Sequence, residues 1–173
     1  MLKLRKNKKG FTLVELIVVI AIMAVLAGVV AGVTVSQLNK QTDKTGATQA
    51  NTVASFISEC ALTGDEPATQ IVKSILVTDT ESGTTTDKNV FDVQKVKDLI
   101  DAQYTAASIT VENATKNTVG SDKGKVYITF GGVPTNDTTI ADTVIVTYKP
   151  KASGTATTTF TINADGVVTK SLN

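Results

Sequence analysis

The chain has 173 residues, enough for one domain with a modest core, and its net charge of +1 hides an uneven distribution. Five of the 17 basic residues lie in the first ten positions; from residue 11 onward 12 basic residues, none of them arginine, face 16 acidic ones. A body without arginine disfavours a nucleic-acid-binding surface, because that side chain makes the forked contacts to phosphates and base edges. The sequence has no histidine, one cysteine and no compact Ser, Lys or paired-carboxylate motif. We therefore expect no enzyme, no metal site and no cofactor.

An apolar run at residues 11–35 follows a basic leader at residues 1–10. As a helix of about 25 residues it would extend about 37 Å, enough to cross a hydrocarbon core of about 30 Å. Glu15 is its only charged residue, and the next charge is Lys40. The run exceeds the apolar part of an ordinary secretory signal, which has about 7 to 15 residues. The basic leader predicts a cytoplasmic N-terminus, with the chain beyond the span outside.

Residues 36–63 continue the helix in amphipathic form. Apolar residues there recur at spacings of three and one, typical of one buried helical face; they are Ala50, Val53, Ala54, Ile57, Cys60 and Ala61. No proline occurs before Pro67, so we expect one helix of about 50 residues, roughly 75 Å long. Cys60 is expected to be a small core residue on the buried face.

Residues 64–106 are predicted to be a helical and loop connection. ATQIVKSILV, residues 68–77, follows a proline suited to a first helical turn, and FDVQKVKDLIDAQ, residues 91–103, has its apolar residues on one stripe. A polar loop separates them and carries Asp79, Glu81 and Asp87. Their spacing does not fit an EF-hand calcium loop, and a solvated acidic loop is the favoured interpretation.

Residues 107–173 change to a period of two, which predicts strands. SITVEN, KVYITFGG, DTVIVTYKP, TTTFTIN and GVVTKS alternate in whole or in part, and Asp165 with Gly166 forms a tight-turn signal. We expect an antiparallel sheet of four to five strands whose apolar face covers the amphipathic half of the helix. The predicted fold class is α+β, with a long N-terminal helix packed on a C-terminal sheet.

The stretch KKG followed by FTLVELIVVIAIMAVLAGVVAG, from Lys8 to Gly32, resembles the class III leader and N-terminal helix of type IV pilins and related pseudopilins. The resemblance covers roughly the first 35 residues, and the order of helix and sheet extends it to the type IV pilin fold. It implies that a prepilin peptidase cuts after Gly10 and N-methylates Phe11. It also implies that Glu15 is the acidic residue used in filament assembly.

Two interpretations of Glu15 remain open at this point. In the first, Glu15 lies near the membrane interface and is merely tolerated there. In the second, cleavage after Gly10 creates an amine on Phe11, and the Glu15 of a neighbouring subunit neutralises it. Since the two residues are four positions apart, about 6 Å along a helix, pairing between subunits would require an axial stagger.

Gly28 and Gly32 also have two interpretations. Small residues allow membrane helices to pack closely. The resemblance alternatively implies that the segment from Ala24 to Gly32 loosens on assembly.

The single cysteine rules out an intrachain disulfide, so the chain lacks the C-terminal disulfide loop of many pilins. This difference from the family favours a Gram-positive source.

The function implied by the resemblance is that of a structural subunit, a major pilin of an extracellular type IV pilus that supports adhesion, surface motility, aggregation or biofilm formation. Its partners would be copies of itself in a helical filament, the prepilin peptidase, the pilus assembly platform and minor pilins. Before assembly it would be a single-pass protein of the cytoplasmic membrane. The alternatives are a pseudopilin of a type II secretion-like or competence system, and a single-pass membrane-anchored extracellular domain.

Overall fold

The computed structural model describes residues 10–63, 75–79, 88–104, 109–112, 118–134 and 138–173. The chain divides into two compact units, Met1–Asn39 and Lys40–Asn173; we call the second the head. Helix α1, Leu13–Thr63, runs through the boundary without a break. This confirms the single long helix expected from the continuous apolar and then amphipathic pattern.

None of the large apolar side chains of the first unit is buried in a core. Every large apolar side chain from Phe11 to Leu38 is 49% exposed or more. The most apolar part of α1 is long and hydrophobic enough to cross a membrane, with a mean hydropathy of 3.0. These side chains therefore lie on the surface of the described chain and outside its hydrophobic core.

The head is built on a five-stranded sheet with the order β3-β4-β6-β7-β8. The strands are β3 Ile109–Val111, β4 Lys125–Gly131, β6 Thr143–Lys149, β7 Thr158–Asn163 and β8 Val168–Leu172. All neighbours pair antiparallel except β3, which runs parallel to β4. Parallel pairing needs a connection of about a dozen residues, and residues 112–124 supply it. The α+β fold class is confirmed, with this one parallel edge as a difference.

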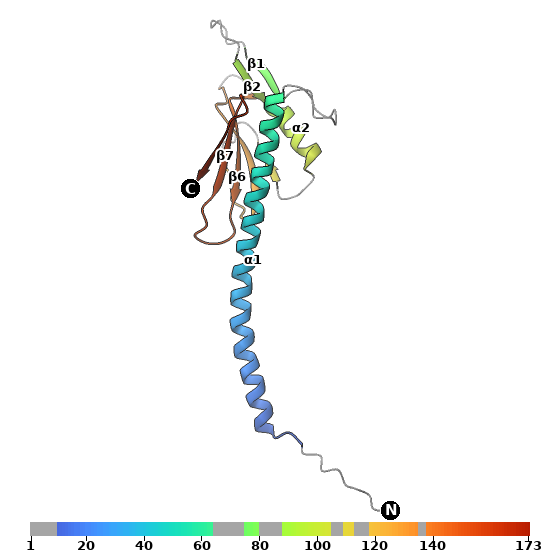
Figure 1. Cartoon of the computed structure of the whole chain (residues 1–173), viewed down its shortest axis with the longest axis vertical. Coiled ribbons are helices and arrows are strands. Elements are labelled where there is room, and N and C mark those ends of the chain that lie inside the picture. Colours follow the sequence, from blue (N-terminus) through green and yellow to red (C-terminus); the bar gives the residue numbers. More distant parts are fainter. Residues whose placement is uncertain (1–9, 64–74, 80–87, 105–108, 113–117, 135–137) are drawn as a thin grey trace, which may run out of the picture. The chain divides into compact units, whose positions relative to one another are not determined.

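One face of the sheet covers the second half of α1, as Figure 1 shows for the head. The buried helix residues are those of the expected stripe, and Cys60 among them is 8% exposed. Inward residues of three strands complete the core: Val126, Ile128 and Phe130 of β4, Val144, Val146 and Tyr148 of β6, and Phe160 and Ile162 of β7. Within each strand these inward residues stand two positions apart, as the alternation of apolar and polar residues predicts.

A second, small sheet and helix α2 complete the head. The sheet has the order β1-β2-β5, with β1 Leu76–Asp79, β2 Lys88–Asp92 and β5 Ile140–Ala141. Helix α2 spans Val93–Gln103 and lies beside α1, where the rings of Phe56 and Tyr104 meet edge to face with centroids 5.9 Å apart.

The expected helix at residues 91–103 is confirmed, except that its first two residues end β2. Asp92 caps it, accepting hydrogen bonds from the backbone nitrogens of Gln94 and Lys95 at 3.0 and 3.1 Å. The expected helix at residues 68–77 is wrong at its end, because Leu76 and Val77 lie in β1 and pair with β2. Pairing with that neighbouring strand outweighed the local helical pattern there. The rest of that prediction lies outside the described residues.

Candidate functional site

Gly10 and Phe11 lie in non-helical backbone just before α1, whose first residue is Leu13. Both are exposed, Phe11 to 93%. A Cβ atom built on Gly10 would meet nothing within 4 Å. Neither residue is packed against the described part of the chain.

Thr12 and Glu15 form a capping box at the start of α1. The Glu15 carboxylate accepts hydrogen bonds from the backbone nitrogen and the hydroxyl of Thr12, at 2.8 and 2.9 Å. In return the backbone nitrogen of Glu15 donates to the Thr12 hydroxyl at 3.2 Å. The sequence analysis missed this pair, although a threonine followed three residues later by a glutamate is the capping-box signature. Glu15 thus has a local partner in the single chain.

Leu13, Val14 and Leu16 surround Glu15 with apolar side chains that are 63% to 73% exposed. The segment from residue 11 to residue 39 contains no lysine or arginine. A cationic partner for Glu15 from this segment would therefore have to be a new N-terminal amine. An amine on Phe11 arises only if the chain is cut after Gly10.

Gly28 and Gly32 lie within the unbroken part of α1. A Cβ atom on either would meet nothing within 4 Å. Within the described parts of the chain, no contact requires glycine at these positions. Close packing against another helix and loosening on assembly both remain predictions.

A second charged site lies in the head and was not predicted. Asp43, only 5% exposed, projects from α1 and accepts three hydrogen bonds from the sheet. The Tyr148 hydroxyl donates at 2.9 Å, and the backbone nitrogens of Lys151 and Ala152 donate at 2.7 and 2.9 Å. We call this group the Asp43 clamp. It fixes the end of β6 and the following turn to the helix.

Gly46 allows the Tyr148 ring to reach the clamp. One helical turn beyond Asp43, a Cβ atom on Gly46 would collide with that ring. Burial, followed by the hydrogen bond to Asp43, raises the pKa of Tyr148 well above its usual range, so its hydroxyl stays a donor. A signal existed in the sequence, because Asp43 and Gly46 extend the stripe that begins at Ala50 backwards at helical spacing.

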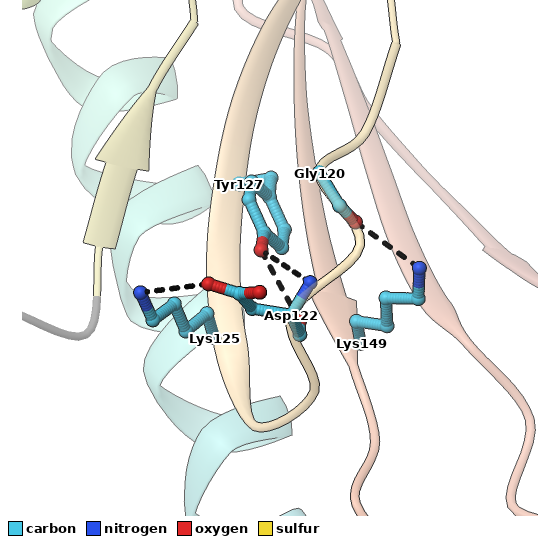
Figure 2. A network of polar contacts seen from close by, with 5 residues as sticks. All are labelled: Gly120, Asp122, Lys125, Tyr127 and Lys149. Atoms are coloured by element: carbon cyan, nitrogen blue, oxygen red, sulfur yellow. Dashed lines mark hydrogen bonds and ion pairs between the residues drawn. The ribbon is translucent and has the colours of Figure 1, made fainter.

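Beside the clamp, a polar network holds the loop before β4 (Figure 2). The Tyr127 hydroxyl accepts from the Asp122 backbone nitrogen at 3.1 Å and donates to the Asp122 carbonyl at 3.2 Å. Lys125 pairs with the Asp122 carboxylate at 3.2 Å, and Lys149 donates to the Gly120 carbonyl at 3.1 Å. This network contains two lysines, Lys125 and Lys149, at one end of the sheet.

The described part of the chain contains no group of three His, Cys, Asp or Glu side chains able to hold a metal ion. Of the acidic loop residues, Asp79 ends β1, whereas Glu81 and Asp87 lie outside the described residues. The solvated-loop interpretation of these acids stays a prediction.

Residues 5–31 match the family of the prokaryotic N-terminal methylation motif. The matched range contains Gly10, Phe11 and Glu15 and ends before Gly32. No curated protein and no solved structure matches the chain. The motif is that of a structural protein family, processed by a prepilin peptidase and assembled into filaments or membrane systems. The match at the N-terminus supports a class III signal peptide and a type IV pilin-like prepilin.

Proposed function

We propose that this chain is a structural subunit, the major pilin, of an extracellular type IV pilus that supports adhesion, surface motility or aggregation. The observation that carries the proposal is the exposed apolar surface of α1 from Phe11 to Leu38. A surface of this length is costly in water and stable either in a bilayer or against other copies of the same helix. The segment would serve as an anchor before assembly and as the filament core afterwards.

The proposed processing step is cleavage between Gly10 and Phe11 by the prepilin peptidase, followed by N-methylation of Phe11. Cleavage removes the basic leader and leaves a cationic amine one residue before Thr12. The Glu15 carboxylate, which the same chain holds through Thr12, is then the nearest side-chain acid in the sequence. We propose that it exchanges this local partner for the amine of an adjacent subunit.

Such pairing explains why a filament results and not a closed ring. Glu15 lies four residues beyond Phe11, about 6 Å along α1, so two copies at the same height do not align these groups. A contact between different surfaces of neighbouring copies, repeated with a fixed axial step, grows into a fibre. The assembly platform in the membrane and minor pilins are the further partners that this proposal includes.

The test is a pair of substitutions at Glu15 in the producing organism. Glu15→Gln removes the charge but keeps an amide oxygen that can cap the helix, since glutamine also serves in capping boxes. Glu15→Ala removes both. We expect both variants to be cut after Gly10 and both to lack surface filaments in electron micrographs of sheared material. Normal filaments from Glu15→Gln would reduce the residue to a helix cap and overturn its role in assembly.

A pseudopilin of a secretion or competence system is the second candidate, because the methylation motif alone fits it equally. Detection of this chain in long filaments outside the cell supports the pilin, and its confinement to the envelope supports the pseudopilin. A membrane-anchored domain that is never processed would keep Met1. Mass spectrometry of the mature N-terminus distinguishes that case, because a processed subunit begins with N-methylated Phe11.

A further inference from the structure

One end of the five-stranded sheet gathers lysine side chains. Lys125 begins β4 and Lys149 ends β6, and the two are directly paired across the strands. The Gly124 nitrogen donates to the Lys149 carbonyl at 2.6 Å, and a Cβ atom on Gly124 would collide with the Lys151 side chain. Lys123 precedes Gly124 and is exposed. Four lysines from two segments far apart in sequence thus lie together.

The Asp43 clamp joins this end of the sheet to two further lysines on α1. Asp43 binds the backbone of Lys151, and Lys40 and Lys44 flank Asp43 in the helix. Those two are four positions apart, so they share a face of α1, and both are exposed. We call the six residues the lysine end: Lys40, Lys44, Lys123, Lys125, Lys149 and Lys151.

The charge of the head is divided between its two ends. From Lys40 onward the sequence has 12 lysines and 15 acidic residues. Among the described residues, the lysine end has six lysines near two acids, the buried Asp43 and the exposed Asp122. At the opposite end of the strands stand acids instead, with Asp142 before β6 and Asp165 after β7. The lysine end is therefore a basic patch, which an anionic surface would attract.

The lysine end is tied to the apolar segment by a short length of chain. Lys40 is only five residues further along the chain than Val35, the last residue of the apolar run. Asp43, whose carboxylate binds the end of β6 and the following turn, is eight residues beyond Val35. We propose that, while the chain is anchored in a bilayer, the lysine end contacts anionic phospholipid headgroups. The inference rests on the membrane insertion contained in the proposed function.

The expected strength of this contact comes from the number of lysines. Each basic residue near an anionic leaflet is attracted to it, so a few together raise the equilibrium constant for contact severalfold to about a hundredfold. The attraction fades within a Debye length of the surface. Lys125 has a carboxylate partner in Asp122, so the four exposed lysines, at positions 40, 44, 123 and 151, carry most of it. A second copy of the chain, offering its acidic end, is the competing occupant.

The experiment uses the full chain in lipid nanodiscs that hold one copy each, of phosphatidylcholine alone or mixed with phosphatidylglycerol. A neutral acetylating reagent is followed by mass spectrometry at each lysine. We expect acetylation of Lys40, Lys44, Lys123 and Lys151 to be about tenfold slower in the anionic discs. Lys95 and Lys170, outside the lysine end, should change less than about twofold. Salt at about 1 M should remove the difference, because the Debye length falls to about 3 Å.

Variants make the assignment specific. Lys123→Gln with Lys151→Gln should cut the protection of Lys40 and Lys44 severalfold, and the matched control, Lys95→Gln with Lys170→Gln, should leave it intact. Folding is checked by the buried Cys60 thiol, which must remain unreactive in both.

Equal acetylation rates in the two kinds of disc would overturn the inference and leave the pilin proposal standing. Protection that arises only when several copies share one disc, independent of lipid charge, would also overturn it, because a second copy is then the occupant. A chain that does not insert into either disc would overturn both the membrane anchor and the lipid contact.

Discussion

Two carboxylates on the same helix, Glu15 and Asp43, are held in opposite ways. Glu15 is exposed among apolar side chains and is bound by Thr12, three residues away. Asp43 is buried and is bound by groups 105 to 109 residues away. A local hydrogen bond can be exchanged for another partner without disturbing a fold, whereas a long-range one cannot be lost without separating two elements. Glu15 is therefore suited to assembly, and Asp43 to holding the head together.

The glycines of α1 repeat the contrast. A Cβ atom on Gly28 or Gly32 would meet nothing within 4 Å among the described residues, whereas one on Gly46 would collide with the Tyr148 ring. In the first unit the side chains are available to other molecules; in the head they are committed to the fold. Substitutions at the contacts of the head should therefore destabilise the fold, whereas substitutions in the first unit should leave the head unchanged.

Removing the Asp43 side chain should have the largest effect. Asp43→Ala leaves the Tyr148 hydroxyl and two backbone N–H groups without their acceptor, at a cost of about 3 kcal/mol. Urea unfolding of the full chain in detergent, followed by the reactivity of the buried Cys60 thiol, measures it. The matched control Asp101→Ala, at an exposed position of α2, should leave the midpoint within error. An unchanged midpoint for Asp43→Ala would show that the clamp does not support the head.

Substituting Gly46 should come next. Alanine normally favours a helix over glycine by about 1 kcal/mol, but at Gly46 its methyl group would displace the Tyr148 ring from Asp43, so we expect a net loss of about 2 kcal/mol. Gly28→Ala should produce no loss, because nothing stands in its way. Equal effects of the two substitutions on Cys60 reactivity in urea would contradict the proposed difference between the units.

Alkaline pH should weaken the head through Tyr148, by less than removing Asp43 does. The pKa of Tyr148 is raised in the folded state above its usual value of 10.0. Below pH 10 both states keep the proton and the full contribution is present; above it the unfolded chain loses the proton first, so stability falls as the pH rises. The urea midpoint of the native chain should therefore fall more between pH 9 and pH 11 than that of Tyr148→Phe. Parallel curves would exclude Tyr148 as the linked group.

The Thr12 cap should have the smallest effect. Thr12→Ala should cost about 1 kcal/mol at the start of α1 and should speed amide hydrogen exchange in its first turn. Thr12→Ser should restore slow exchange, because serine caps equally well. Neither should alter the unfolding of the head. A loss of head stability in Thr12→Ala would mean that the two units are not separate in their energetics.

The sequence predicted those features that depend on local periodicity. The long helix, α2 and the alternation along β4 and β6 all follow from spacings of two or three to four residues. The parallel pairing of β3 and the small β1-β2-β5 sheet did not, because they join segments distant in sequence. The Asp43 clamp was missed for the same reason, and the Thr12–Glu15 cap only because its signature lies inside a stronger apolar pattern.

The clamp cannot form until most of the chain has been synthesised, because it joins Asp43 to residues 148–152. Asp43 leaves the ribosome long before Tyr148, its nearest partner in sequence, has been made. Until residue 152 exists, the helix from residue 40 to residue 63 has an uncovered apolar face with an ionised carboxylate at one end. Contacts across such separations form slowly compared with helices. During synthesis the chain therefore passes through a stage in which the helix is complete and the head is not.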